Sequence, residues 1–277
     1  MIARVLIVAG SDSSGGAGIQ ADIKAVTALG GYAATAITAL TAQNTLGVEA
    51  VVGSDPDFVG QQIRLVLDDI GADAIKTGML YSARIIERVA AELELRATNV
   101  PIVVDPVMVA KGGAPLLEAE ARATLVRRLL PMSALVTPNV PEAEALTGIR
   151  AESAADLPRL ADGVLALGPS AVLVKGGHLE GDTVVDLLRT ADGAERRFES
   201  PRIRTRSTHG TGCTLASAIA TGIAEGWTLE SAVARAREYV HTAIRTAPGL
   251  GSGHGPLNHV WPITERAERT RQANGER

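Results

Sequence analysis

The sequence predicts an α/β protein in which a mostly parallel central sheet is covered by helices on both faces. Two observations lead to this prediction. Short apolar, strand-like runs alternate along the chain with longer stretches of helical periodicity, as is typical of parallel sheets with crossover helices. In addition, no internal repeat or low-complexity linker divides the 277 residues. We therefore expect a single domain over residues 1–264, followed by a charged, frayed tail over residues 265–277.

The first two thirds of the chain contain the units of the parallel sheet. The apolar runs predicted to form strands are Arg4–Ala9, Ala33–Leu40, Ala74–Thr77, Pro101–Asp105, Ala134–Thr137 and Ala171–Lys175. The stretches predicted to form helices are a segment ending at about Leu29, then Asp55–Ile70, Ala83–Leu95, Glu118–Leu130 and a helix opening at Pro141–Leu146. Pro56 near the start of one helix suits the first turn, where the missing N–H of proline is not needed.

The pattern then changes from strand–helix units to a hairpin. Two strand-like runs, Val184–Leu188 and Arg196–Phe198, flank the dipeptide Asp192-Gly193, which is typical of a tight hairpin turn. The C-terminal third is predicted to be helical over Gly212–Gly226 and Leu229–Ala247. These two helices complete the predicted domain.

The composition excludes several classes of protein. Lys and Arg number 27 against 31 Asp and Glu, a net charge of −4, so no basic field would attract nucleic acid or an anionic membrane. No apolar run approaches the ~18 residues needed to cross a bilayer, and Met1–Arg4 leads directly into a strand, so we expect no signal peptide. The single cysteine, Cys213, excludes an intrachain disulfide and favours the cytoplasm. Aromatic residues make up only 3%, too few for a base-stacking or carbohydrate platform, and we expect an enzyme.

Small or polar residues follow the predicted strands at the points where these end. In open α/β sheets, ligands bind beyond the carboxyl ends of the strands, so these residues are expected to lie together. They are Gly10, Gln43, Thr77, Asp105, Asn139 and Lys175. The sequence therefore predicts a ligand site at this edge of the sheet.

A glycine-rich turn, Gly15–Gly18, follows the first strand. Gly16–Ala21 fits a loose dinucleotide-binding fingerprint, but the acidic residue expected at the end of the second strand is missing from Thr35–Thr41. We favour the alternative of a tight turn that lets a small ligand approach the backbone, because glycine tolerates positive φ. No Gly-Lys dipeptide occurs in the sequence, so a classical P-loop is excluded.

A second glycine-containing loop, Ser207–Thr214, precedes a predicted helix. Its backbone N–H groups and the positive end of the helix dipole would form a cradle for phosphate. Cys213 lies at this helix N-terminus, where the pKa of a thiol is lowered from about 8.5, so it could act as a thiolate base or nucleophile. The simpler alternatives are an ordinary helix cap and a small buried cysteine.

Polar or charged side chains that could bind a metal ion or a phosphate follow three of these strands. Asn139 and Glu142 lie three residues apart on one helix face, and together with Asp105 they could hold Mg²⁺ through water. The simpler alternative for the first two is a helix cap with an acidic first turn. Lys175–His178 combines a cation with two glycines, which suits the oxygens of a phosphate.

Taken in order, these motifs resemble one known family. The segments that carry the resemblance are Ser11–Asp22, Thr38–Thr45, Lys76–Leu80, Asp105–Met108, Thr137–Ala143, Lys175–His178 and His209–Thr214. From Val5 to about His259 the chain resembles the hydroxymethylpyrimidine/phosphomethylpyrimidine kinases of thiamine biosynthesis, in the ribokinase-like superfamily. The resemblance implies a three-layer α/β/α sandwich that lacks a β lid. It also implies that two copies of the chain form a homodimer. It also implies two phosphorylations with ATP and Mg²⁺, first of 4-amino-5-hydroxymethyl-2-methylpyrimidine and then of its monophosphate.

The resemblance also implies roles for individual residues. The residues that match the pyrimidine pocket are Gly10, Ala17, Asp22, Gln43, Met79 and Val107. The residues that match nucleotide and phosphate positions are Asn139, Lys175, Thr208, Gly210, Thr211 and Gly212. Asp105 and Glu142 match the positions associated with Mg²⁺. Cys213 matches the catalytic position, at which sugar kinases of the superfamily carry aspartate, and Lys175 is expected to take part in catalysis.

Three alternatives remain. A pyridoxal or pyridoxine kinase of the same superfamily would bind a similar flat ring bearing a hydroxymethyl group, although Gln43 with Met79 suits the aminopyrimidine better. A thiol hydrolase would use Cys213 as nucleophile and His209 as base, but it leaves Lys175 and the acidic residues without roles. A binding protein without activity would keep the pocket and would have no need of the catalytic set.

Overall fold

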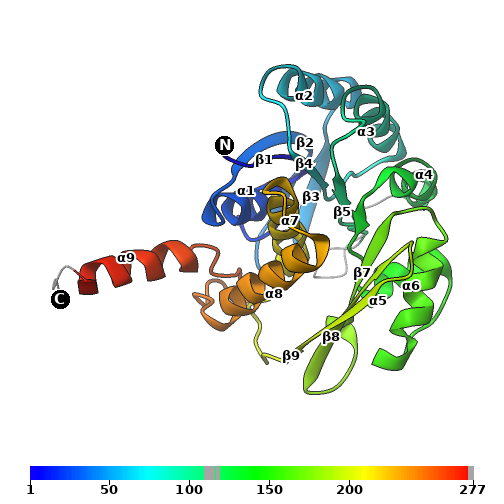
Figure 1. Cartoon of the computed structure of the whole chain (residues 1–277). Coiled ribbons are helices and arrows are strands. Elements are labelled where there is room, and N and C mark those ends of the chain that lie inside the picture. Colours follow the sequence, from blue (N-terminus) through cyan, green and yellow to red (C-terminus); the bar gives the residue numbers. More distant parts are fainter. Residues whose placement is uncertain (109–115, 117–118, 274–277) are drawn as a thin grey trace.

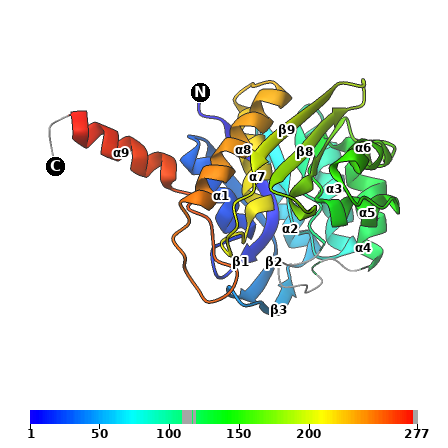
Figure 2. The same ribbon diagram turned by 90° about the horizontal axis from the view of Figure 1, so that it is seen from below.

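A computed structural model describes residues 1–108, 116 and 119–273 of the chain. Within these residues, nine strands form one sheet in the order β3-β2-β1-β4-β5-β6-β7-β8-β9 (Figures 1 and 2). The strands are β1 (Arg4–Asp12), β2 (Tyr32–Gln43), β3 (Val48–Gly53), β4 (Ala74–Thr77), β5 (Ile102–Val104), β6 (Leu135–Val136), β7 (Ala171–Lys175), β8 (Thr183–Thr190) and β9 (Glu195–Pro201). All predicted strands are confirmed. Every strand in the described part of the chain belongs to this sheet, so a separate β lid is absent from that part.

The centre of the sheet is parallel and its two edges are antiparallel. The strands from β2 through β1, β4, β5 and β6 to β7 pair in parallel. The predicted hairpin of β8 and β9 is confirmed at one edge, and Gly193 in its turn has a φ of 92°, which favours glycine. At the other edge lies β3, which the sequence analysis does not predict. None of the residues of this strand is buried, and it folds back onto β2 through a turn in which Asn44 Oδ1 accepts a hydrogen bond from Leu46 N at 2.8 Å.

Helices cover both faces of the sheet, which confirms the predicted α/β/α sandwich (Figures 1 and 2). One face carries α1 (Gly18–Ala28), α7 (Thr211–Ala224) and α8 (Leu229–Arg245). The other face carries α2 (Pro56–Asp69), α3 (Ala83–Arg96), α4 (Ala119–Thr124), α5 (Val140–Thr147) and α6 (Leu157–Leu165). Helix α6 is an addition to the sequence prediction. The predicted helix over Glu118–Leu130 begins outside the described residues at Glu118, and after α4 it continues as a π-helical turn and a 3₁₀ turn.

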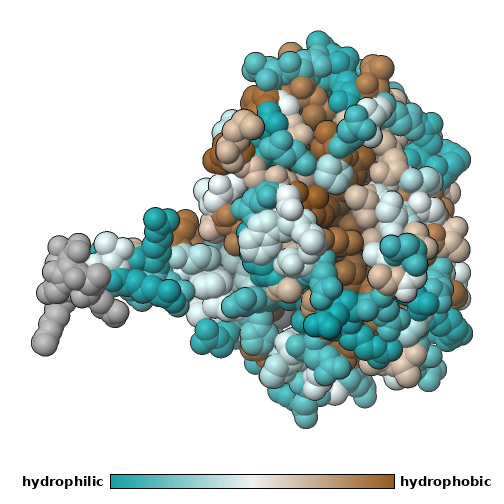
Figure 3. All heavy atoms as spheres, viewed as in Figure 1, coloured by the Kyte–Doolittle hydropathy of each residue, from teal (hydrophilic) through white to brown (hydrophobic). Residues whose placement is uncertain are grey.

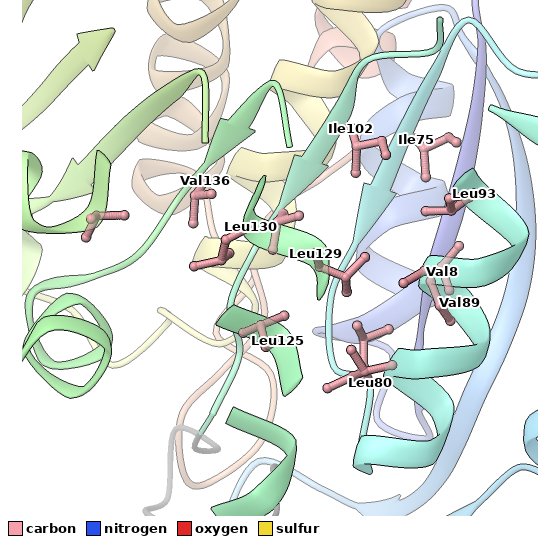
Figure 4. Close-up of a cluster of buried hydrophobic side chains, with 14 of the residues drawn as sticks. Val8, Ile75, Leu80, Val89, Leu93, Ile102, Leu125, Leu129, Leu130 and Val136 are labelled. Atoms are coloured by element: carbon pink, nitrogen blue, oxygen red, sulfur yellow. The ribbon is translucent and has the colours of Figure 1, made fainter. Parts of the chain in front are cut away.

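The core lies in two apolar layers, one on each face of the sheet. Side chains of β1 pack alternately into the two layers, with Leu6 and Val8 on one face and Val5 and Ile7 on the other. Figure 4 shows the first layer, where Val8 and other strand residues meet side chains of α3 and of the turns after α4. Burying each such side chain contributes about 1.5–3 kcal/mol, so these layers hold the strand ends in place.

The C-terminal segment differs from the predicted frayed tail over residues 265–277. It forms helix α9 (Trp261–Ala273), which projects from the sandwich and carries mainly hydrophilic residues (Figures 1 and 3). The helix is anchored at its start, because Trp261 Nε1 donates to the carbonyl oxygen of Tyr239 at 3.1 Å. Residues 274–277 lie outside the described part of the chain. None of the helices described is long and apolar enough to span a membrane.

Candidate active site

The carboxyl ends of the parallel strands open into a cavity of about 1030 Å³. The strands run in one direction, so the residues that follow them meet at one edge of the sheet. The predicted site residues that line the cavity are Gly10, Ala17, Gln43, Met79, Asp105, Val107, Asn139, Glu142, Lys175, Thr208, Gly210, Thr211, Gly212 and Cys213. Asp22 is the exception and does not line it.

The N-terminus of α7 forms one wall of this cavity. Gly210 caps the helix with a φ of 78°, and a Cβ at this position would lie 1.9 Å from the carbonyl oxygen of Gly16. Only glycine fits there, and its lack of a side chain lets this loop contact the glycine-rich turn after β1. In the first helical turn, a Cβ on Gly212 would lie 3.2 Å from Lys175 Nζ. The first N–H groups of a helix have no carbonyl partner within it, so they can bind an anion beside Lys175.

Lys175 ends β7 and lies between two carboxylates. Its Nζ is 3.0 Å from Asp105 Oδ1 and 3.9 Å from Glu142 Oε2. Burial lowers the pKa of Lys175, but the two carboxylates outweigh burial and raise the pKa above its ordinary value. Lys175 is therefore a permanent cation beside the N-terminal amides of α7.

Asn139 and Glu142 form a capping box at the start of α5. Asn139 Oδ1 accepts a hydrogen bond from Glu142 N at 2.8 Å, and Glu142 Oε2 accepts one from Asn139 N at 2.7 Å. The cap proposed as the simpler alternative is thus present, and it also holds the Glu142 carboxylate near Lys175. Burial raises the pKa of Glu142 to about 7. Lys175 lowers this pKa by attraction, but repulsion from Asp105 partly cancels the effect of Lys175.

Asp105 and Glu142 offer the oxygen ligands that Mg²⁺ prefers. Asp105 Oδ1 also accepts a hydrogen bond from Thr137 Oγ1 at 3.1 Å, which orients its carboxylate. Within the described ranges, no group of three or more His, Cys, Asp or Glu side chains could hold a metal ion. Proteins commonly bind Mg²⁺ through one or two carboxylates together with water and substrate phosphates. The two carboxylates fit Mg²⁺ in that way, with phosphates completing the site.

Cys213 lies in the first turn of α7, as predicted, but its pKa is not lowered. Burial raises the pKa of the thiol from 9.0 to about 12, against the opposing effect of Lys76. Asp22 and Asp105 raise the pKa further. The predicted thiolate is therefore wrong for the ligand-free site, because even partial burial of Cys213 raises its pKa by more than the helix N-terminus lowers it. Cys213 is a neutral thiol at neutral pH.

Asp22 is predicted from the sequence to line the substrate pocket, and the structure corrects this prediction. Its carboxylate is fully buried and accepts hydrogen bonds from Lys76 Nζ at 2.8 and 2.9 Å. It also accepts one from Ser217 Oγ at 2.7 Å. The inner face of α1 packs on the sheet and on α7, so Asp22 points into the core and joins these elements beneath the cavity.

Lys76→Met is expected to lower the free energy of unfolding by about 3–5 kcal/mol, since it leaves Asp22 buried without its partner. The double variant Lys76→Met/Asp22→Asn removes both charges and keeps a hydrogen-bonding partner for Ser217. It should recover most of the lost stability, because a buried pair contributes little net energy. Urea denaturation followed by circular dichroism measures all three proteins. A double variant less stable than Lys76→Met would contradict this account.

The end of the cavity beyond the neighbouring strands β2, β1 and β4 presents apolar side chains and an amide. A Cβ on Gly10 would lie 2.3 Å from Met79 Cε, so Met79 packs directly on β1. Met79 and Val107 offer apolar surface to a planar ring, and Gln43 offers both a donor and an acceptor. This end therefore fits a small heteroaromatic ring with a hydrogen-bonding edge.

The structure adds a pair that the sequence analysis does not assign. Asp12 Oδ2 lies 2.8 Å from His209 Nε2, and both side chains are buried at the cavity wall. His209 thus bonds to the end of β1, which leaves the Cys213–His209 pair of a thiol hydrolase without support. Both residues lie in motif segments, but their pairing joins positions 197 residues apart, for which the sequence has no local signal.

A three-layer α/β/α sandwich whose parallel strands end beside an anion-binding helix N-terminus, a lysine and two carboxylates is a ribokinase-like architecture for small-molecule kinases. Comparison with known proteins specifies the family. Residues 12–258 match the family model described as phosphomethylpyrimidine kinase, and the chain belongs to this family. The resemblance seen in the sequence is confirmed.

Individual relatives agree with this assignment. Over 258 residues the chain is 54% identical to the thiamine biosynthesis bifunctional protein ThiED of Geobacter sulfurreducens, covering 92% of this chain and 52% of that protein. It therefore spans about half the length of that relative. It is 51% identical over 262 residues to the hydroxymethylpyrimidine/phosphomethylpyrimidine kinase of Streptomyces coelicolor, covering 94% of this chain and 96% of that one. Among solved structures, an ADP complex of Bacillus subtilis pyridoxal kinase is similar with a TM-score of 0.85 and 34% identity, covering 94% and 98% of the two chains.

Proposed function

We propose that this protein is an ATP-dependent kinase of thiamine biosynthesis. It phosphorylates 4-amino-5-hydroxymethyl-2-methylpyrimidine to its monophosphate and then to its diphosphate. The observation that carries the proposal is one cavity lined by two chemically different groups of residues, which follow strands on opposite sides of the sheet's centre. One end offers Gln43, Met79 and Val107 to a ring, and the other offers Lys175 and the first turn of α7 to a phosphoryl group. The similarity to the hydroxymethylpyrimidine/phosphomethylpyrimidine kinase of Streptomyces coelicolor supports the same assignment.

The roles of the residues follow from the charge that moves. Phosphoryl transfer is catalysed mostly by positioning and electrostatic stabilisation. In this proposal Lys175 and the amides of α7 stabilise negative charge on the transferring group. Cys213 would receive the proton of the acceptor. The residues that would hold the phosphates of ATP are Asn139, Thr208, Gly210, Thr211 and Gly212. Asp105 and Glu142 would hold Mg²⁺, which when bound neutralises phosphate charge.

An assay with Mg-ATP and three acceptors tests the proposal. The hydroxymethylpyrimidine, its monophosphate and pyridoxine are compared as separate substrates, and ADP release is followed. We expect both pyrimidines to be phosphorylated with a higher kcat/KM than pyridoxine. The similarity to Bacillus subtilis pyridoxal kinase makes pyridoxine the specific alternative. A higher kcat/KM for pyridoxine would replace the proposed substrate, and no turnover of any acceptor would overturn the kinase assignment.

The two steps are expected to depend differently on pH. With a thiol pKa of about 12, the thiolate fraction of Cys213 rises tenfold for each pH unit between 7 and 9. The rate of the alcohol step should rise with it and reach no plateau in this range. The monophosphate acceptor is already a dianion above its second pKa of about 6, so its rate should level off above pH 7. Initial rates in buffers of constant ionic strength measure both profiles, and identical profiles would contradict the role of Cys213 as base.

We further propose a homodimer located in the cytoplasm, as the family resemblance and the single cysteine suggest. Leu40 of β2 and Val52 of β3 pair across the edge of the sheet and are 54% and 65% exposed. This outer ribbon carries apolar surface that a second copy would cover. Sedimentation equilibrium should give twice the 28.7 kDa mass of the chain, and Leu40→Glu should shift the species towards monomer. A monomer in the unmodified protein at micromolar concentration would contradict the dimer.

A further inference from the structure

The Asp12 carboxylate is an acceptor of an unusually large set of hydrogen bonds. It accepts from Ser14 N and Oγ, from the amides of Gly16 and Ala17 and from His209 Nε2, at distances of 2.8–3.1 Å. Burial alone would raise the pKa of Asp12, but these bonds lower it to about 2. The carboxylate is therefore ionised at neutral pH and can only accept. Its short contact with His209 consequently requires a hydrogen on Nε2, whether the ring is neutral or charged.

The ring of His209 is held firmly in this position. Its backbone N–H donates to the carbonyl oxygen of Gly255 at 3.0 Å. The ring covers the glycine-rich turn so closely that a Cβ on Gly16 would lie 2.4 Å from His209 Cδ2. The side chain is buried at the cavity wall, so it cannot turn away from Asp12 without moving two loops.

The hydrogen on Nε2 has a consequence for Gln43. In the structure the Gln43 Nε2 atom lies 3.3 Å from His209 Nε2, which places two donors face to face. At the other side of the amide, Gln43 Oε1 lies 3.2 Å from Thr41 Oγ1. That hydroxyl also donates to the carbonyl oxygen of Ser11 at 3.0 Å, although it has one hydrogen. Both conflicts disappear together when the amide is turned by 180°, because its oxygen and nitrogen occupy equivalent positions. Gln43 Oε1 then shares the single Nε2 hydrogen of His209 with Asp12, as the more distant of the two acceptors at 3.3 Å against 2.8 Å.

We propose that His209, held by Asp12, is a positioning residue that fixes the orientation of the Gln43 amide. The orientation of this amide determines which hydrogen-bonding groups on the edge of the ring substrate the pocket can pair with. In this orientation Gln43 Oε1 faces His209 and Gln43 Nε2 donates to Thr41 Oγ1, which keeps its own hydrogen for Ser11. The amide then presents an acceptor on the His209 side and a donor on the Thr41 side. The proposal rests on the proposed function for the identity of the substrate.

This fixed order matches one edge of an aminopyrimidine. That edge carries an amino group, which donates, next to a ring nitrogen, which accepts. The amino group would bind Oε1 on the His209 side, and the ring nitrogen would bind Nε2 on the Thr41 side. Pyridoxine lacks an amino group beside its ring nitrogen, so it cannot make both bonds. A site built to pair both groups rejects a ring that leaves them unpaired, and a freely turning amide would lose this discrimination.

A double-mutant cycle tests the proposal. The quantity measured is the ratio of kcat/KM for the hydroxymethylpyrimidine to that for pyridoxine. His209→Phe keeps the ring and removes the donor, and it should reduce the ratio by about tenfold or more through a higher KM for the pyrimidine, with kcat within about threefold. In a Gln43→Leu background the same change should alter the ratio by less than about twofold, since there is no amide left to orient. Ser14→Ala, which removes another donor to Asp12, is the matched control and should leave the ratio unchanged.

Two outcomes of the cycle would overturn the proposal. One is an unchanged ratio in His209→Phe, and the other is an equal loss in the presence and absence of Gln43, which would indicate a general effect on the loop. Thr41→Val removes the acceptor at the far side of the amide and should reduce the ratio in the same direction. It provides the same test if His209→Phe does not fold.

A measurement without substrate separates this proposal from the proposed function. Two-dimensional ¹H–¹⁵N spectra of the histidine rings in the unmodified protein report which ring nitrogen carries hydrogen, and His209→Phe assigns the signal. We expect a protonated Nε2. An unprotonated Nε2 would overturn the inference even in a fully active kinase. A protonated Nε2 in a protein that does not phosphorylate the pyrimidine would instead reject the substrate and leave the amide orientation standing.

Discussion

Cys213→Ala is expected to reduce phosphorylation of the alcohol by about 10²–10⁴-fold and to reduce phosphorylation of the monophosphate much less. The alcohol is a poor nucleophile whose proton must leave as the new bond to phosphorus forms. The monophosphate is anionic already, because its second pKa is about 6, and it needs no base. Lys175 and the N-terminal amides of α7, which are proposed to serve both steps, remain in the variant. Initial rates of the two steps, assayed separately with saturating Mg-ATP, measure the difference.

The neutral state of the Cys213 thiol makes this experiment more informative. A base with a pKa of about 12 acts through a small thiolate fraction, which Lys76 favours and burial opposes. Cys213→Ser replaces the thiol by a hydroxyl of similar size, and this variant should behave like Cys213→Ala if the thiolate is the base. A parallel loss in both steps would mean that Cys213 shapes the anion site. Little loss in either step would leave it as a small packed residue.

Lys175→Ala is expected to lower turnover by roughly 10²–10³-fold in both steps, in line with the loss of one preorganised donor to the developing charge. The effect should appear mainly in kcat, since Lys175 is proposed to act on the group being transferred. The variant also removes the cation between Asp105 and Glu142, which lie 3.0 and 3.9 Å from its Nζ. Steady-state kinetics with each pyrimidine acceptor provide the measurement.

A matched control distinguishes catalysis from general loss of charge. Lys24 also lies near the glycine-rich turn, where its Nζ donates to the carbonyl oxygen of Gly15 at 2.8 Å, but it is exposed and outside the cavity. Lys24→Ala should therefore leave turnover within about threefold of the unmodified protein. The same small effect in Lys175→Ala would remove Lys175 from the mechanism.

Much of the fold could be predicted because its signals are local. Apolar runs ending in small or polar residues mark the parallel strands, and Asp192-Gly193 marks the hairpin. The exposed strand β3 and the short helix α6 are additions that these signals did not predict. Helix α9 is found where a frayed tail was expected, and its start is held by a hydrogen bond from Trp261 to Tyr239, a contact that periodicity in one segment does not reveal.

The candidate site could be located from the sequence for a similar reason. Parallel strands place their carboxyl ends at one edge, so residues that follow different strands, such as Asp105 and Lys175, converge without any knowledge of distances. The predicted lining residues do converge on one cavity, apart from Asp22. Their roles remain those of the proposed kinase and await the experiments above.

By itself, the sequence determined the fold class, the family, the edge of the sheet that carries the cavity and most of the residues around it. Tertiary structure decided the state of the buried charges. The pKa of Cys213 rises from 9.0 to about 12, which corresponds to about 4 kcal/mol, whereas a helix N-terminus contributes about 0.3–1 kcal/mol. Likewise, the pairing of Asp22 with Lys76 and of Asp12 with His209 depends on contacts between distant segments. Burial and ion pairing are sums over neighbours in space, so a pattern along the chain cannot specify them.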